Sequence, residues 1–308
     1  MRPASRRRLF PAEARRSSSR RESGSRALQS RHCIGGILGG VTTMEDAPPR
    51  SAGFDPTEPS AARIYDYLLG GKDNYAVDRE AADRLLAVVP DQRLLARTNR
   101  AFVLRGVRLS TEQGIRQVLD LGTGLPTSPS VHEVVHAVDP SARIVYVDSD
   151  PLVKAHNDAL LAAPDEVTSI EGDIRRPEEI VDRLRRDRLI DFAEPVTVVL
   201  AAVLHLVPDA LDPAGIVARF AGPLAPGSHL VLSQFAAHSD PAAIAALRSI
   251  ADGTAVETYF RTREEIERLF AGFDLLPPGV VDVGQWRPDA DAPSTHLKIS
   301  GGVGRKPA

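Results

Sequence analysis

The sequence predicts an α/β protein in which a helical segment precedes a doubly wound, mostly parallel sheet. From residue 117 onward, short apolar runs alternate with amphipathic segments, as in parallel strands joined by crossover helices. The first apolar run, 117–121, leads into two glycines spaced one residue apart, Gly122 and Gly124. Such a turn lets the backbone approach a ligand closely, and the helix that follows offers free N–H groups. We therefore expect a site for a nucleotide-type cofactor at this turn.

Composition excludes several classes of protein. With 308 residues, 43% hydrophobic and 26% charged, the chain can form one large domain or two small ones. The single cysteine, Cys33, excludes an intramolecular disulfide framework and a Cys-rich zinc module. The longest apolar run, 196–207, is too short to span a bilayer, and the run 34–41 lacks the cleavage site of a signal peptide. We expect a cytoplasmic protein with no membrane partner.

Residues 1–43 differ from the rest of the chain. They carry ten arginines and seven serines against two acids, Glu13 and Glu22, so we expect a disordered basic tail. Subtracting its charge of about +8 from the −3 of the whole chain leaves about −11 for residues 44–308. The tail could be a nucleic-acid-binding arm, a transit peptide, or upstream sequence outside the native product, with the true start at Met44. The absence of an amphipathic pattern favours the last interpretation, and a nucleic-acid partner is not expected.

Residues 44–115 are predicted to form a helical N-terminal cap segment. Ser60 can cap a helix over 61–69, which Gly70 and Gly71 end. Further helices are expected near 78–89 and 91–107, separated by Pro90 because proline interrupts a helix. The remaining residues, 116–308, are predicted to form the sheet domain.

The elements of the sheet domain follow from its hydrophobic periodicity. Strands are predicted near 117–121, 143–148, 167–171, 196–202, 228–234, 272–276 and 295–300. Helices are predicted near 130–138, 151–162, 177–187, 213–221, 241–251 and 262–270, the last beginning with a capping box of Thr262 and Glu265. Because ligands bind beyond the carboxyl ends of parallel strands, the residues at the strand ends are the candidate binding residues.

Three of these strands end in an acid. Asp120 stands before the glycines, Asp148 ends the next strand, and Asp173 ends the third strand and precedes the apolar Ile174. An acid at the second strand can accept both hydroxyls of a ribose, and Asp173 with Ile174 suits an adenine amino group and ring face. Asp120 suits a ligand with positive charge, such as S-adenosylmethionine (SAM).

The alternative to a SAM-binding protein is an NAD(P)-dependent oxidoreductase. Its fingerprint G-x-G-x-x-G would need a third glycine where this chain has Thr127, so a pyrophosphate turn is poorly matched. Asp120 also stands where that fingerprint usually has an apolar residue, which weakens the alternative further.

Four segments resemble one known family. They are SAARIYDYLLGGKDNY from Ser60, VLDLGTGLPT from Val118, VYVDSDP from Val145 and AAVLH from Ala201. Together they resemble the SAM-dependent methyltransferase family common in actinobacteria and formerly catalogued as a domain of unknown function, over about residues 55–300. The resemblance implies a Rossmann-like methyltransferase fold with seven strands, the last inserted antiparallel. Pro126, where a generic methyltransferase loop often has glycine, is as in the family.

The resemblance also implies roles for individual residues. It places the methionine part of SAM against Asp120, Gly122 and Gly124, the ribose on Asp148, and the adenine near Asp173 and Ile174. Arg63 would pair with the cofactor carboxylate, since guanidinium and carboxylate match as a fork. The segment expected to close over the cofactor comprises Arg63, Tyr65, Gly70, Gly71, Asn74 and Tyr75.

Methyl transfer needs few catalytic groups, because most of the rate can come from holding nucleophile and methyl carbon in line. His205 ends the fourth predicted strand and is the candidate general base for an oxygen nucleophile. No Asp/Asn-Pro-Pro-Tyr/Phe motif stands there, which disfavours methylation of DNA bases or glutamine amides. We expect a small-molecule acceptor in a pocket near His205, Phe235, Tyr259 and Trp286.

Two further alternatives stay open. The chain could bind SAM without turnover, as a sensor, because the sequence does not identify acceptor-binding residues. His132, Glu133 and His136 form a literal H-E-x-x-H, which on a helix can bind zinc. No third ligand is evident and this helix should pack on the sheet, so we expect no metal site.

Overall fold

The computed structural model describes residues 55–160, 166–251, 257–290 and 293–308. The predicted basic tail 1–43 and the alternative start at Met44 lie outside the described residues. The division into a helical cap 44–115 and a sheet domain 116–308 stays a prediction.

Five parallel strands form the centre of the sheet, with the bounds that hydrophobic periodicity predicts almost to the residue. They are β1 (Gln117–Leu121), β2 (Arg143–Asp148), β3 (Val167–Glu171), β4 (Thr197–Ala201) and β5 (His229–Phe235). The strand order is β3-β2-β1-β4-β5-β8-β6, where β6 is Asp274–Leu275 and β8 is Ile299–Arg305. Strands are added in one direction from β1 to β3 and in the other from β4 onward, so the gap between β1 and β4 is the switch point where an open α/β sheet binds ligands.

The last part of the sheet differs from the prediction. The strand predicted at 295–300 is found at Ile299–Arg305, antiparallel to β5, and a further short strand, β7 (Val281–Asp282), makes the sheet eight-stranded. Glycines are depleted in strands, so the segment from Gly301 to Gly304 gives a weak strand signal. Here they permit close packing: a Cβ on Gly301 would lie 2.4 Å from the carbonyl oxygen of Leu232.

The N-terminal helices are α1 (Ala61–Leu69), α2 (Ala76–Val88) and α3 (Gln92–Glu112). The crossover helices follow the strands as predicted, with ends that differ by a few residues: α4 (Val131–His136), α5 (Pro151–Leu160), α6 (Pro177–Arg186), α7 (Pro213–Ala221), α8 (Pro241–Ala251) and α9 (Arg263–Arg268). Two short 3-10 helices, η1 (Leu204–Leu206) and η2 (Asp209–Leu211), follow β4.

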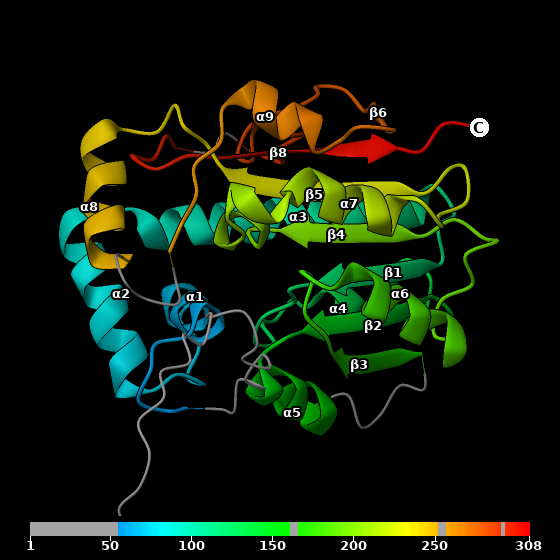
Figure 1. The fold of residues 1–308 in the computed structure, drawn as a ribbon, viewed down its shortest axis with the longest axis horizontal. Coiled ribbons are helices and arrows are strands. Elements are labelled where there is room, and N and C mark those ends of the chain that lie inside the picture. The colour runs from blue at the N-terminus through cyan, green and yellow to red at the C-terminus, as the bar shows by residue number, and fades with distance from the viewer. Residues whose placement is uncertain (1–54, 161–165, 252–256, 291–292) are drawn as a thin grey trace, which may run out of the picture. The chain divides into compact units, whose positions relative to one another are not determined.

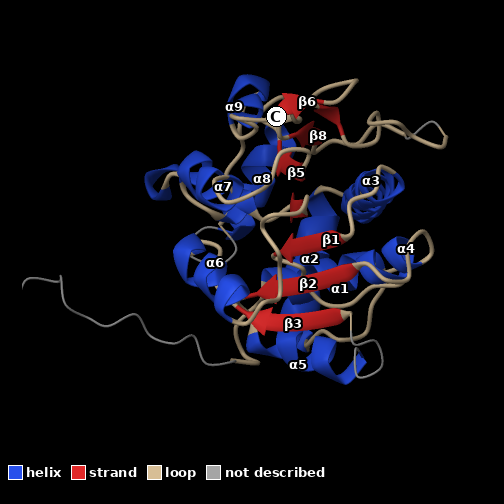
Figure 2. Ribbon diagram, turned by 90° about the vertical axis from the view of Figure 1, so that its right-hand side faces the viewer, coloured by secondary structure: helices blue, strands red, loops and turns tan. Residues whose placement is uncertain are grey.

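Helices cover both faces of the sheet, as Figures 1 and 2 show. One apolar cluster joins the sheet to α6, α7 and α9, and includes Leu119 and Leu121 of β1. The second joins the opposite face to α2, α3, α4 and α8, and includes Val118. Successive residues of β1 thus enter opposite clusters, as the alternation of side chains along a strand requires.

Helices α1, α2 and α8 lie beside the carboxyl ends of the parallel strands, on the left in Figure 1. Helix α2 contacts both α1 and α8, and α1 also contacts α3. This arrangement brings the N-terminal helices to the end of the sheet where the glycine turn lies.

Candidate functional site

A cavity of about 450 Å³ lies at the carboxyl ends of the central strands. Its walls come from α1 and the residues before it, the glycine turn after β1, the loops after β2 and β3, and η1 after β4. The predicted residues that line it are Arg63, Tyr65, Asp120, Gly122, Gly124, Asp148, Asp173, Ile174 and His205. The structure therefore brings together side chains that are up to 142 positions apart in the sequence, counting from Arg63 to His205.

Both glycines of the turn have left-handed backbone conformations, with φ of +71° at Gly122 and +65° at Gly124. A Cβ on Gly122 would lie 2.4 Å from Cγ2 of Val203, so no other residue fits there without displacing its neighbour. The N–H of Gly124 donates to Oδ2 of Asp148 at 2.9 Å, and the space beside its Cα is open. The turn after β1 is thus hydrogen-bonded to the end of the neighbouring strand, β2.

Asp120 is a buried acid of the cavity, and Asp148 is a half-buried one. Burial raises the pKa of Asp120 to about 6, although the nearby charge of Arg100 and a hydrogen bond from Thr123 oppose the shift. Burial also raises the pKa of Asp148, which accepts hydrogen bonds from the N–H groups of Gly124 and Asp150. A ligand that brings a positive charge or hydroxyl donors stabilises the ionised form of carboxylates whose pKa is raised by burial. The ammonium group and ribose hydroxyls of SAM fit this requirement.

Asp173 is less buried than Asp120 and already has a charged partner. Both of its carboxylate oxygens accept from the guanidinium of Arg175, Oδ1 from Nε at 2.9 Å and Oδ2 from Nη2 at 2.6 Å. Burial alone would raise the pKa of Asp173, but these bonds hold it below its ordinary value. Ile174 next to it is 8% exposed and offers an apolar surface to the cavity.

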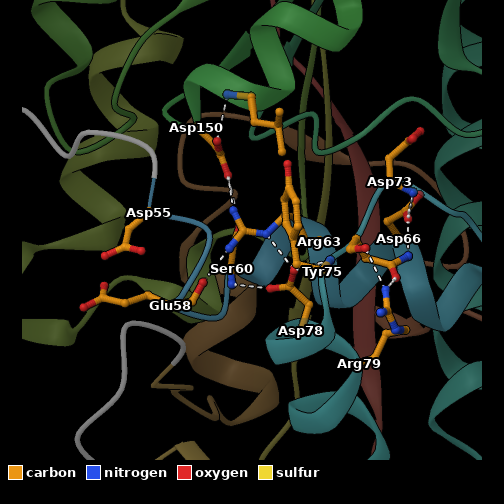
Figure 3. A network of polar contacts seen from close by, with 12 residues as sticks. Asp55, Glu58, Ser60, Arg63, Asp66, Asp73, Tyr75, Asp78, Arg79 and Asp150 are labelled. Atoms are coloured by element: carbon orange, nitrogen blue, oxygen red, sulfur yellow. Dashed lines mark hydrogen bonds and ion pairs between the residues drawn. The ribbon is translucent and has the colours of Figure 1, made fainter. Parts of the chain in front are cut away.

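Arg63 is almost completely buried, and its guanidinium joins several elements (Figure 3). Nε donates to Oδ2 of Asp78 at 2.7 Å, and Nη1 lies 3.8 Å from Oδ2 of Asp150. Asp78 also accepts from the backbone N–H groups of Ser60 and Tyr75. The ion pair therefore fastens the start of α1 to the start of α2. The charge that was predicted to meet a cofactor carboxylate thus has a carboxylate of the protein beside it.

Four residues of the predicted closing segment do not line the cavity: Gly70, Gly71, Asn74 and Tyr75. The first three build the turn between α1 and α2 around Asp66. The N–H of Gly71 donates to the carbonyl of Asp66, and Nδ2 of Asn74 donates to its carboxylate at 2.8 Å. A Cβ on Gly71 would lie 1.8 Å from that carboxylate, so this position requires glycine.

The ring of Tyr75 lies beneath the guanidinium of Arg63, with 5.3 Å between Cζ and the ring centre. Tyr75 is 38% exposed and begins α2 as its N-cap residue. Its contacts therefore support the position of Arg63.

His205 lies in η1, immediately beyond β4, and is 8% exposed. Burial, together with the positive charge of Arg261, lowers its pKa to about 3. Its ring centre is 4.5 Å from that of Phe235, and its buried Nδ1 has no hydrogen-bond partner among the described residues. An imidazole in this state is neutral at physiological pH, offers a hydrogen bond to a ligand, and is a weak base.

Sequence reasoning missed Arg261, which positions the loop that carries His205. Its buried guanidinium donates to the carbonyls of Leu204 and Val207 at 2.9 and 2.8 Å and pairs with Asp209 at 2.8 Å. No local signal identifies this role, because the arginine and the loop it holds are more than fifty residues apart. Ala202 was also missed: it has a left-handed φ of 54°, and such strain in a non-glycine residue often marks a functional site.

A second cavity, of about 110 Å³, adjoins the first. Tyr65, Ala202, His205 and Leu206 are among the residues that line both. Phe235 lines the second cavity, as the predicted acceptor pocket requires, whereas Tyr259 and Trp286 line neither. Trp286 instead packs edge-on against Phe102 in the core, at 5.5 Å between ring centres.

The H-E-x-x-H residues have structural partners on α4. Glu133 and Ser130 form the capping box at the start of the helix. Nδ1 of His132 lies 3.0 Å from the hydroxyl of Tyr146, and Nε2 of His136 lies 2.9 Å from a backbone carbonyl. In the described ranges, no group of three or more His, Cys, Asp or Glu side chains is arranged to hold a metal ion.

Among the helices that the structure describes, none combines the length and the hydropathy that a membrane span requires.

Comparison with known proteins identifies the family. The model of the S-adenosyl methyltransferase family matches residues 48–307. A DUF574 family protein from Streptomyces avermitilis MA-4680 is 38% identical, with a TM-score of 0.77 over 81% of this chain and 98% of that one. A candidate methyltransferase from Thermobifida fusca YX is 40% identical, with a TM-score of 0.77 over 85% of this chain and 98% of that one. No curated protein sequence matches the chain.

The family match and the geometry agree. The matched residues include the glycine turn, the strand-end acids and α1 to α3. The chain belongs to the S-adenosyl methyltransferase family and is a SAM-dependent methyltransferase.

Proposed function

We propose that the protein transfers the methyl group of SAM to a small-molecule acceptor, with the cofactor in the larger cavity. The observation that carries this assignment is the pair of acids, the buried Asp120 and the half-buried Asp148, that line the cavity with Gly122 and Gly124. Asp120 would hold the cofactor ammonium and Asp148 the ribose hydroxyls, while Ile174 would contact the adenine. The net charge of about −11 for residues 44–308 argues against a nucleic-acid acceptor, because phosphates are repelled by a negative surface.

The cofactor, when bound, supplies a methyl group that a sulfonium has already activated. The protein then has to position the acceptor and exclude water. Tyr65 forms part of the wall of both cavities, and its hydroxyl is fixed by the carbonyl of Ala96 at 3.0 Å and Nδ2 of Asn99 at 3.1 Å. A fixed wall of this kind favours in-line approach, which is where most of the rate originates.

His205 has a restricted proton-transfer role in this proposal. With a pKa of about 3, Nδ1 orients the nucleophile by a hydrogen bond and takes up its proton only as positive charge develops on the nucleophile. Arg261 opposes a lasting positive charge on the ring, so the proton passes on to solvent. His205 is thus proposed as a catalytic residue that acts late in the reaction.

The test is the affinity of S-adenosylhomocysteine for Asp148→Ala, measured by calorimetry. We expect a loss of about 100-fold or more, since each hydrogen bond to a charged acceptor contributes about 1.5 to 3 kcal/mol. Glu171→Ala is the matched control, because Glu171 ends β3, is exposed and lines neither cavity. Equal affinity in wild type and folded Asp148→Ala would remove Asp148 from the cofactor site.

A further inference from the structure

We propose that the smaller cavity binds the methyl acceptor and that this acceptor is an uncharged, largely apolar molecule about one ring in size, with a hydroxyl or amino nucleophile. The inference rests on the proposed function, because it takes the larger cavity as the cofactor site. It goes further in naming the chemical class of the acceptor.

The position of the smaller cavity suits an acceptor. Tyr65, Ala202, His205 and Leu206 line both cavities, so the two spaces meet at these residues. A molecule in the smaller cavity can present one atom at this junction, where a bound methyl group would be within reach. Transfer requires the reacting atoms to be about 3 to 3.5 Å apart, which adjoining cavities permit.

The walls of the smaller cavity select against charge. Apolar side chains converge from four elements, with Leu85 on α2, Phe235 on β5, Ile250 on α8 and Ile299 on β8. Arg84 also lines the cavity, but it is exposed to solvent. Transfer of an ionised group into such a space is strongly unfavourable without a buried partner of opposite charge.

Two buried polar atoms indicate where a ligand would bond. Nδ1 of His205 and Oε1 of Gln92 have no hydrogen-bond partner among the described residues, and both residues line the cavity at 8% and 7% exposure. Buried polar groups in native proteins are nearly always satisfied, so a pair of exceptions in one cavity calls for an explanation. A ligand with a hydroxyl or amino group at the His205 end and a second polar group towards Gln92 supplies both missing partners.

The volume limits the size of the acceptor. An apolar protein cavity of about 150 Å³ accommodates benzene. The smaller cavity, at about 110 Å³, is tighter than this, so a single ring or an aliphatic group of similar size is the largest group that it can enclose.

Phenol and benzoate are the probes, since they share one ring and differ in charge. Their affinities for the full chain saturated with S-adenosylhomocysteine are measured by ligand-observed NMR. We expect phenol to bind at least about ten-fold more tightly than benzoate, because only benzoate must bury an ionised group. In the SAM complex, an interligand NOE between the phenol ring and the SAM methyl group is expected as well.

Ile250→Trp fills the cavity from α8 and should weaken phenol binding by at least about ten-fold, since it removes the space that the ring needs. Ile244→Trp is the matched control, because Ile244 is also a partly buried isoleucine on α8 in the same apolar cluster but lines neither cavity. S-adenosylhomocysteine should bind both variants as it binds the wild type.

The outcomes separate the two proposals. Failure of wild type to bind S-adenosylhomocysteine would count against the proposed cofactor site itself. If it binds but phenol has no advantage over benzoate, gives no NOE, or binds Ile250→Trp undiminished, the assignment of the smaller cavity is overturned. An equal loss of phenol in Ile244→Trp would also overturn it, because the effect would then not be local. Should Ile250→Trp fail to fold, the phenol and benzoate comparison on wild type still decides.

Discussion

At the scale of single residues, the proposed role of Asp120 in cofactor binding conflicts with the stability of the cofactor-free protein. Burial raises its pKa to about 6, so near neutral pH the folded protein holds a carboxylate that it does not fully solvate. The cofactor ammonium would supply the missing charge. The proposed ligand would account for a carboxylate at this position, because an apolar or neutral side chain would suit the cofactor-free fold better.

Cofactor affinity should therefore depend on pH through Asp120. Below pH 6 the carboxyl is protonated in the free protein and must lose its proton to bind the ammonium group. Affinity for S-adenosylhomocysteine should fall as pH decreases below about 6, by up to about ten-fold per pH unit, and Asp148, whose pKa is also raised, adds in the same direction. Calorimetry from pH 5 to 8 measures this, with Asp139→Asn as the control, because Asp139 is a half-buried acid that accepts a hydrogen bond from Ser141 and lines neither cavity.

Asp120→Asn should bind weakly at every pH but stabilise the cofactor-free protein at pH 8. A folded pKa raised above the unfolded value of 3.8 contributes stability below pH 3.8 that is lost as pH rises through about 6. Two pKa units correspond to at most about 3 kcal/mol. A variant that loses both affinity and melting temperature would instead show that the carboxylate is a structural requirement.

At the scale of elements, the joint between α1 and α2 depends on one buried ion pair. Arg63 and Asp78 have side chains that are 3% and 0% exposed, and Asp78 also accepts two backbone N–H groups. A hydrogen-bonded carboxylate of this kind fixes where both helices begin. Because α1 forms a wall of both cavities, the pair also sets the shape of the site.

Asp78→Ala should destabilise the protein by about 3 to 5 kcal/mol, because it leaves the guanidinium of Arg63 buried without its main partner. Urea unfolding measures the change. Asp158→Ala is the control: Asp158 pairs with Lys154 on the surface of α5, where a pair contributes about 1 kcal/mol or less. A loss below about 1 kcal/mol for Asp78→Ala would mean that water or another group replaces the carboxylate.

At the scale of the whole molecule, buried histidines should set the response to acid. Burial lowers the pKa of His205 to about 3 and that of His229 to about 4, with Arg261 and Arg305 acting in the same direction. Both values lie below the ordinary 6.5. At pH values between the folded and the ordinary pKa, the unfolded chain binds protons that the folded protein does not. The free energy of unfolding therefore falls as pH decreases from about 6.5 towards 4.

His205→Gln should flatten this loss by up to about 1.4 kcal/mol per pH unit between pH 6.5 and 4, the value for one proton. His229→Gln, at the opposite end of the sheet from the cavities, should act in the same direction and leave S-adenosylhomocysteine affinity unchanged. Urea unfolding at pH 7, 6 and 5 provides the slopes. Parallel slopes in wild type and both variants would contradict the assignment of these rings as buried and neutral.

The sequence by itself determined the alternating fold, the bounds of β1 to β3 and the position of the glycine turn at the strand ends. These features depend on local hydrophobic periodicity and on the rule that parallel strands end at one edge, so Asp120 and Asp148 could be located without coordinates. Only the tertiary structure decided that Arg63 pairs with Asp78, that Gly70, Gly71 and Asn74 serve a turn around Asp66, and that two cavities meet at His205. These outcomes depend on which distant segments pack together, and the burial that shifts the pKa of His205 exists only once β5, η1 and Arg261 are assembled.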